Sequence, residues 1–443
     1  MPDGFSSDTW LDLAAPAGTR PAIIARLHAV PKDAAADRVV RAKLGGDCPE
    51  VVFNTPAEFK AILPGETDRC GILVNEPGIK VERRVQTMAA ALSPRIHEVP
   101  DDLLAAIDWC YEQGWTDGLP VVPPAVDRVK AVLAADSRPA ETVICRHPAT
   151  GLDLSLHAAA VNAVMAGCLP GHFPVLVAAF EAMDLEGFNF HGSTASTGGS
   201  APLLIVSGPY ADAIGMNGDV NLFGPGNRAN ATIGRAVRLI LRNVFQMLPG
   251  ISDKSTQGNP GKYSLCIAER ARGNPWPPLC EAQGYAKGVS SVTCYAAGGF
   301  CNVENHGGNT PEQVLGSVAD AMANYGCITL GQSVVILAPE HMQILGAAGW
   351  SRERAQEFLF GAAKRPVDGM RSVGKYRDRE YDAQHGAGAH GLAEAGFVHR
   401  GLSPRDILIT MGGGDAGGHS CFLPSWSRGR GSIMQHKPIT VRS

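Results

Sequence analysis

Short apolar segments separated by glycine and proline are the feature that most limits the folds open to this chain. Its 52 glycines and 31 prolines make up about 19% of the 443 residues, against an average of about 12%. No short period organises them, which argues against collagen and low-complexity sequence. Such frequent turns are typical of an enzyme in which strands and helices alternate and the connecting loops are long.

The apolar segments have the lengths and periods of both strands and helices. Ala201–Ser207 and Val334–Leu337 are short and almost continuously apolar, as core strands are. Between Ala229 and Phe245 the apolar residues recur at helical spacing. We therefore predict an α/β fold, with mixed or parallel sheets covered by helices. Because Pro209 and Pro339 follow the two strands and lead into short helical stretches, a duplicated lobe is a further hypothesis.

Composition divides the chain into five parts. Residues 364–400 differ most, because charges of both signs precede a stretch rich in glycine and histidine. We interpret this segment as a solvated linker or, alternatively, as a mobile lid over a site. The full division is an N-terminal arm at 1–20, a small α/β domain at 21–98, an α/β core with ligand loops at 99–363, the linker or lid, and a strand with a glycine-rich loop at 401–443 that completes the core.

Charge and apolar content exclude several classes of protein. The net charge is −4 and no basic stripe appears, so a nucleic-acid partner is not expected. The longest apolar runs, such as Phe173–Phe180, are far shorter than the roughly 20 residues of a membrane helix. The first residues lack a signal pattern and no Cys-x-x-Cys occurs, which favours a cytoplasmic location. Charged residues are only 19%, so we expect a homo-oligomer that covers part of a neutral surface.

A glycine-rich loop precedes the clearest predicted helix. Backbone N–H groups in such a loop can approach a ligand closely, and a helix N-terminus favours an anion. The segment lacks the Gly-Lys-Ser/Thr ending of a P-loop and the Gly-x-Gly-x-x-Gly of dinucleotide sites, so no nucleotide cofactor is expected. The alternative is a capped helix with a solvated arginine face. The candidate substrate-binding residues here are Gly224, Gly226, Asn227, Arg228 and Asn230.

Basic and hydroxyl side chains follow that loop. Arg235, Arg238 and Arg242 are spaced by three and four residues and therefore share one helix face. Lys262, expected to lead a strand, and Tyr263 lie just beyond a segment rich in turn residues and hydroxyls. This region is either a pocket wall, with both residues binding substrate, or an ordinary surface turn.

Four histidines lie in loops or at strand ends. His341 and His419 follow predicted strands, where α/β sheets place their ligand sites. With His306 they could hold zinc, iron or manganese, although no diagnostic spacing such as His-Glu-x-x-His is present. His191 and His306 are candidates for acid–base catalysis. The alternative is that each is a hydrogen-bonding histidine of the fold.

A thiol and a carboxylate complete the catalytic candidates. Cys301 lies five residues before His306, and Cys421 lies two residues after His419. A cysteine needs a neighbouring base or positive charge to act as a nucleophile. Asp117 lies between a predicted helix end and a proline-rich segment. It is interpreted as a turn-forming residue, with a general base as the alternative.

Three motifs carry a resemblance to a known family. They are Trp-Thr-Asp-Gly-Leu-Pro-Val-Val-Pro-Pro at 115–124, Phe-Gly-Pro-Gly-Asn-Arg-Ala-Asn-Ala-Thr-Ile-Gly-Arg at 223–235 and Pro-Gly-Lys-Tyr at 260–263. The chain resembles a family of functionally uncharacterised prokaryotic proteins over roughly residues 100–425. The resemblance implies no reaction, but it implies a small thiol- or selenol-containing protein as a partner.

These observations favour a cytoplasmic enzyme that cleaves a small polar or anionic metabolite. A hydrolase or lyase is expected, with or without a divalent metal held by histidines, because no nicotinamide or flavin motif is present. One alternative is a thiol-dependent oxidoreductase component that uses Cys301 or Cys421. Another is a non-catalytic ligand-binding or scaffold subunit.

Overall fold

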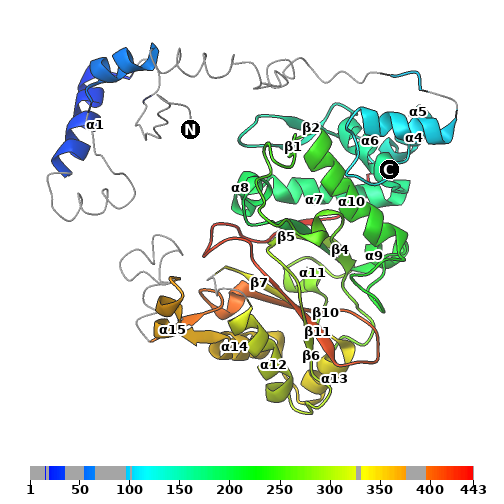
Figure 1. Cartoon of the computed structure of the whole chain (residues 1–443). Coiled ribbons are helices and arrows are strands. Elements are labelled where there is room, and N and C mark those ends of the chain that lie inside the picture. Colours follow the sequence, from blue (N-terminus) through cyan, green and yellow to red (C-terminus); the bar gives the residue numbers. More distant parts are fainter. Residues whose placement is uncertain are drawn as a thin grey trace. The chain divides into compact units, whose positions relative to one another are not determined.

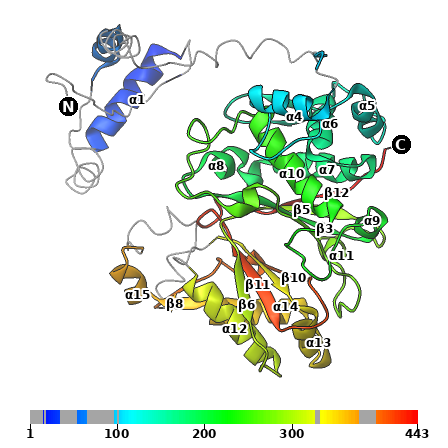
Figure 2. The same ribbon diagram turned by 45° about the vertical axis from the view of Figure 1, so that its right-hand side comes forward.

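The computed structural model divides the chain into two compact units, Met1–Leu92 and Ser93–Ser443 (Figures 1 and 2). The structure describes residues 15, 19–34, 54–64, 96–99, 102–325, 331–375 and 396–442. Each unit is considered by itself. Within the described residues, no helix combines the length and the apolar character needed to cross a bilayer.

The smaller unit contains helix α1 (Pro21–Ala34) and a second helix over residues 56–64. Thr55 and Glu58 form reciprocal hydrogen bonds at the start of the second helix, with the Thr55 N–H 2.7 Å from Glu58 Oε2. The strands expected within 21–98 lie almost entirely outside the described residues, as does most of the arm expected at 1–20.

The larger unit has two four-stranded mixed sheets. In the first, β3 (Ala201–Ser207) lies between β4 (Cys266–Ala268), which is parallel to it, and β5 (Ser291–Ala297), which is antiparallel. Strand β12 (Gln435–Pro438) extends this sheet beside β5. The outer face is covered by α6 (Leu156–Ala166), α7 (Phe173–Met183) and α10 (Arg228–Asn243).

The second sheet repeats this order of strand directions. Strand β7 (Ser333–Leu337) lies between the parallel β10 (Ile407–Met411) and the antiparallel β11 (His419–Pro424). Strand β6 (Cys301–Glu304) pairs with β11. Helices α12 (Pro311–Asn324), α13 (Pro339–Ala347) and α14 (Arg352–Ala362) cover its outer face. The predicted α/β fold is confirmed, whereas the duplicated lobe stays a prediction.

The two sheets pack against each other, so the unit has four layers: helices, sheet, sheet and helices (Figure 1). Leu203 and Ile205 of β3 contact the second sheet, while Leu204 and Val206 contact the helices. Both faces of β3 are therefore buried, which explains why its sequence is continuously apolar instead of alternating. An antiparallel bridge between Ala297 and Ser425 joins the two sheets.

Shorter elements complete the larger unit. Asp102 caps α4 through a 2.8 Å hydrogen bond from the Ala105 N–H. The remaining elements are α4 (Leu103–Glu112), α5 (Val126–Leu133), β1 (Val143–Arg146), β2 (Asp153–Ser155), η1 (Pro170–His172), η2 (Glu186–Phe188), α8 (Phe190–Ala195), α9 (Pro209–Ala213), η3 (Pro260–Lys262), α11 (Leu279–Ala282), β8 (Lys364–Pro366), α15 (Val367–Ser372), β9 (Phe397–His399) and η4 (Pro404–Asp406).

One expectation is corrected here. Lys262 does not lead a strand, because Asn259 accepts the Gly261 N–H and turns the chain into η3 before β4 begins at Cys266. At the described ends of 364–400, β8 pairs with β9 and Arg400 is 1% exposed, while the interpretation of the segment as a linker or a lid stays a prediction. Residues 376–395, where a lid would lie, are outside the described residues.

Candidate functional site

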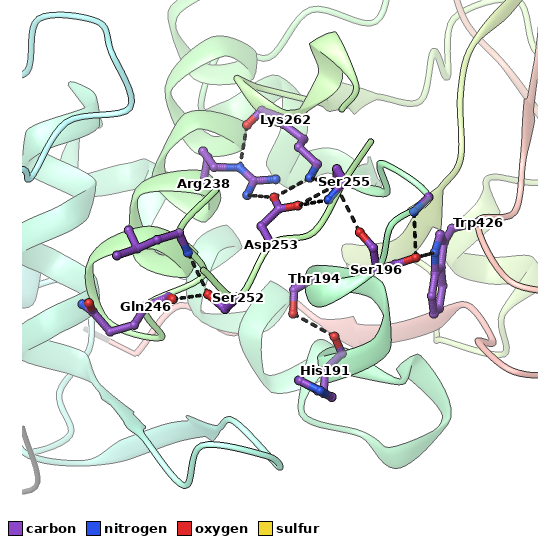
Figure 3. A network of polar contacts seen from close by, with 12 residues as sticks. His191, Thr194, Ser196, Arg238, Gln246, Ser252, Asp253, Ser255, Lys262 and Trp426 are labelled. Atoms are coloured by element: carbon purple, nitrogen blue, oxygen red, sulfur yellow. Dashed lines mark hydrogen bonds and ion pairs between the residues drawn. The ribbon is translucent and has the colours of Figure 1, made fainter. Parts of the chain in front are cut away.

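Four polar side chains meet beside the C-terminal half of α10 and form the Lys262 cluster: Arg238, Asp253, Ser255 and Lys262 (Figure 3). Arg238 projects from α10, Lys262 ends η3, and the other two lie on the loop between them. The Arg238 Nε donates to the Lys262 carbonyl oxygen at 2.8 Å, which fixes the loop against the helix.

Ser255 lies between a cation and a carboxylate. The Lys262 Nζ donates to Ser255 Oγ at 2.6 Å and to Asp253 Oδ2 at 2.5 Å. The Ser255 Oγ lies 2.5 Å from Asp253 Oδ1, to which it donates. The Ser196 carbonyl oxygen is a second acceptor at 3.2 Å. This arrangement holds one hydroxyl in a defined orientation next to a basic nitrogen.

The cluster is largely shielded from water. The side chains of Asp253 and Lys262 are 5% and 15% exposed. Burial lowers the pKa of Lys262 below its usual value, although the pairing with Asp253 opposes this. Burial acts to raise the pKa of Asp253, but the hydrogen bonds from Lys262 and Ser255 outweigh it and hold that pKa below its usual value. Asp253 is therefore ionised at neutral pH.

Positive charge exceeds negative charge on this face of α10. Arg242 lies one turn beyond Arg238, and its buried Nε has no hydrogen-bond partner within the described residues. Burial lowers the pKa of Arg238, and the neighbouring Arg242 acts in the same direction. Asp253 pairs with Arg238 and Lys262, the Asp117 carboxylate also acts on Arg238, and Arg242 adds a further positive charge beside them. The surplus suits an anionic group on a ligand.

The polar groups of the predicted glycine loop form hydrogen bonds that stabilise the fold. Asn227 caps α10 by accepting the Asn230 N–H at 3.0 Å, and Asn230 bonds both backbone polar groups of Asn217. Arg228 donates from Nε to the Gly167 carbonyl oxygen at 3.0 Å. Gly226 has a φ of 124°, which favours glycine, and a side chain on Gly224 would collide with Asn221. These contacts fit the capped-helix alternative. Tyr263 is exposed beside Lys262.

Asp117 forms a bidentate ion pair with Arg235, at 2.9 Å from Nε and 2.8 Å from Nη2. The Arg235 Nη2 also donates to the carbonyl oxygens of Leu119 and Pro120. Asp117 additionally accepts the Leu119 N–H, as the turn-forming interpretation predicts. It therefore attaches the proline-rich segment to α10 and is not placed as a general base.

We expect Asp117→Asn to lower the free energy of unfolding by about 2 kcal/mol, because a nearly buried bidentate pair loses its charge and one acceptor. Urea denaturation at pH 7 measures the change. Asp127→Asn, on the exposed start of α5, is the control and should differ from wild type by less than about 0.5 kcal/mol. A stable Asp117→Asn protein would contradict the structural role.

Two of the three predicted metal-binding histidines are in contact, and the third has other partners. The rings of His306 and His419 have centroids 5.0 Å apart. His341 is buried, and its nitrogens are occupied by Ser420 Oγ at 2.7 Å and by the Asn305 carbonyl oxygen at 2.9 Å. In the part of the chain that the structure describes, no group of three or more His, Cys, Asp or Glu side chains could hold a metal ion. The divalent-metal prediction gains no support from this arrangement.

His191 stands apart from the Lys262 cluster. It lies on α8, and its ring points away from Asp253, Ser255 and Lys262 (Figure 3). Its ring contacts that of the fully buried His147, with centroids 5.3 Å apart. The acid–base role predicted for His191 therefore has no acid or base partner in the cluster.

Neither candidate thiol is activated. Cys301 and Cys421 lie on the paired strands β6 and β11. Burial raises the pKa of both thiols, so both are protonated at neutral pH. A reactive cysteine requires the opposite shift, so the thiol-dependent alternative gains no support here.

The sequence predicts Lys262 as a substrate-binding residue and the hydroxyl-rich loop before it as either a pocket wall or a surface turn, but it gives Asp253, Ser255 and Arg238 no catalytic role. The signal available was the Asp253–Thr256 segment, which is rich in hydroxyls and precedes Lys262. No spacing in it predicts that these residues meet Arg238, because that contact depends on how η3 folds back onto α10.

No family model, curated protein or solved structure matches this chain. The assignment of function therefore depends on the geometry of the chain itself.

Proposed function

We propose that the protein is a hydrolase that cleaves a small anionic metabolite at the Lys262 cluster, with Ser255 as the nucleophile. The observation that carries this proposal is the position of Ser255 Oγ, 2.6 Å from Lys262 Nζ. A serine hydroxyl becomes a nucleophile when an adjacent base removes its proton. A lysine can be that base when burial lowers its pKa, and burial does so for Lys262.

The reaction begins with neutral Lys262. As Ser255 Oγ bonds to an acyl carbon of the substrate, its proton passes to Lys262 Nζ and the carbonyl electron pair moves to oxygen. When that pair returns, the bond to the leaving group breaks and the leaving group takes the proton from Lys262. Water then attacks the acyl group on Ser255 with Lys262 again as base, releasing the acid product and restoring the serine.

The neighbouring residues bind the substrate and orient the two reacting side chains. Asp253 fixes the positions of the Lys262 and Ser255 side chains through hydrogen bonds to both. Arg242 offers a buried Nε without a partner among the described residues, one turn from Arg238. An anionic group on the substrate would occupy that donor and offset the surplus positive charge.

Labelling with a fluorophosphonate tests the nucleophile without knowledge of the substrate. Wild-type protein should gain one adduct by intact-mass spectrometry, located on the peptide that contains Ser255. Ser255→Ala should abolish the adduct, and Lys262→Met should slow labelling by about a hundredfold or more, as loss of a general base does. Thr256→Ala, at the neighbouring exposed hydroxyl, is the matched control and should label like wild type.

The pH dependence gives a second readout. Labelling should accelerate as the pH rises and Lys262 loses its proton, with a midpoint below the ordinary lysine value of about 10.4. An adduct that persists in Ser255→Ala would refute the proposal. So would the absence of any adduct across this pH range.

A further inference from the structure

A cavity of about 750 Å³ lies between the β1–β2 hairpin, the segment joining α7 to α8, and the chain around Arg430. None of the four residues of the Lys262 cluster lines it. Its volume falls in the range of about 300–1,000 Å³ that is usual for small-molecule sites. Its charged lining residues are Arg146, Asp184, Glu186 and Arg430.

Two of these charged residues are already used by the fold. Arg146 forms a bidentate pair with Asp153, at 2.6 and 2.8 Å, and its N–H donates to Asp184 Oδ1 at 2.8 Å. Glu186 and Arg430 differ, because neither side chain has a hydrogen-bond or ion-pair partner in the described part of the chain. The cavity therefore presents one guanidinium and one carboxylate that are not engaged there, beside the Asp184 carboxylate, which accepts a backbone hydrogen bond but forms no ion pair among the described residues.

The rest of the lining is partly apolar. Met183 and Phe190 are buried and, with Leu185, supply an apolar wall. The wall is rigid, because Asn189 donates to the Gly431 carbonyl oxygen at 2.6 Å and the Ile433 N–H donates to the Gly187 carbonyl oxygen at 2.7 Å. The C-terminal segment is thus fixed against the α7–α8 connection, and the cavity is formed in advance of binding.

An unpaired buried group adjoins this wall. His147 lies between two lining residues, Arg146 and Pro148, and its ring contacts Phe190 at 5.3 Å between centroids. The Nδ1 accepts the Thr150 N–H at 3.2 Å, so the proton is on Nε2, which has no partner in the described residues. Burial lowers the pKa of His147 to about 4, so it is neutral. His147 itself does not line the cavity, so this N–H is not one of the groups that a ligand in the cavity would contact.

We propose that this cavity binds a small zwitterion with an apolar body, of amino-acid or dipeptide size. Arg430 would receive the carboxylate, Glu186 the ammonium group, and Met183, Leu185 and Phe190 the apolar part. A ligand with a single charge would leave either Arg430 or Glu186 unmatched. The zwitterion pairs both, which is why this class is preferred over a simple anion.

Calorimetric titration of the full chain tests this proposal. The probes are L-phenylalanine and L-leucyl-L-phenylalanine, compared with 3-phenylpropionate, which lacks the ammonium group, and phenethylamine, which lacks the carboxylate. We expect saturable binding of at least one zwitterion and at least about tenfold weaker binding of both analogues. Absence of binding by both zwitterions up to about 10 mM, above the usual range for metabolites, would overturn the proposal.

Substitutions locate the binding site. Arg430→Gln should weaken zwitterion binding about tenfold or more, and Glu186→Gln should remove the preference for phenylalanine over 3-phenylpropionate. Arg428→Gln, two residues from Arg430 and not part of the lining, is the matched control and should bind like wild type. Binding unchanged in both cavity variants would also overturn the proposal. Ser255→Ala should bind the zwitterion as wild type does. A failure of the zwitterion proposal can therefore be distinguished from a failure of the hydrolase proposal.

Discussion

Replacing Arg400 with methionine is expected to lower the free energy of unfolding by about 3 kcal/mol, because two buried carbonyl oxygens lose their donors. The guanidinium donates to the carbonyl oxygen of Met322 from Nε at 3.0 Å and from Nη2 at 2.6 Å, and to that of Tyr325 at 3.2 Å. The Met322 carbonyl belongs to the last turn of α12, where no intrahelical donor remains, and Tyr325 is the C-cap residue of the helix. Methionine fills a similar volume but supplies no donor.

Urea denaturation of the full chain at pH 7 measures this effect. Arg405→Met is the matched control, because Arg405 is exposed and lies five residues away in the chain. It should change the free energy of unfolding by less than about 0.5 kcal/mol. Equal stability of the two variants would show that Arg400 does not anchor α12.

Replacing Asp253 with asparagine is expected to cost about 3 kcal/mol at pH 7, because Lys262 and Arg238 remain buried without their counter-charge. The same variant should lose fluorophosphonate labelling of Ser255, since Asp253 orients both the serine and the lysine. Asp212→Asn, on the exposed side of α9, is the control for stability and should differ from wild type by less than about 0.5 kcal/mol.

The effect of Asp253→Asn should depend on pH in a defined direction. The pKa of Asp253 is lowered in the folded state, so its ionised form stabilises the fold above its unfolded pKa of about 3.9. This contribution is lost as the pH falls through the folded pKa. The stability difference between wild type and Asp253→Asn should therefore be full near pH 7 and shrink below pH of about 4. A difference that is constant with pH would indicate that the charge of Asp253 is not what stabilises the cluster.

Much of the fold is predictable because each predicted strand or helix has an apolar pattern within its own segment of the sequence. Strand β3 has the predicted bounds, and α10 begins one residue before its predicted start. Strands β6 and β12 were not predicted, because each is four residues long and neither is continuously buried. Short edge strands form where a sheet offers hydrogen-bonding partners, and a sequence pattern does not record those partners.

The candidate site was predicted less well, for a related reason. Lys262 and the arginines of α10 were recognised by residue type, but Asp117 proved to be engaged in an ion pair with Arg235, 118 positions away. His341 was assigned to a metal, yet Ser420, 79 positions away, occupies one of its nitrogens. Whether a polar side chain is free for chemistry depends on partners that are distant in sequence.

The sequence by itself determined the α/β class, the buried strands and the main helices, because apolar periodicity decides which faces of a segment leave water. Only the tertiary structure decided which polar groups are paired and which remain available. It placed Arg400 of a charged segment beneath α12 and brought Ser255 to Lys262. The physical reason is that an ion pair or hydrogen bond requires contact within about 3 Å, and contacts of that length between distant residues exist only after the layers have packed.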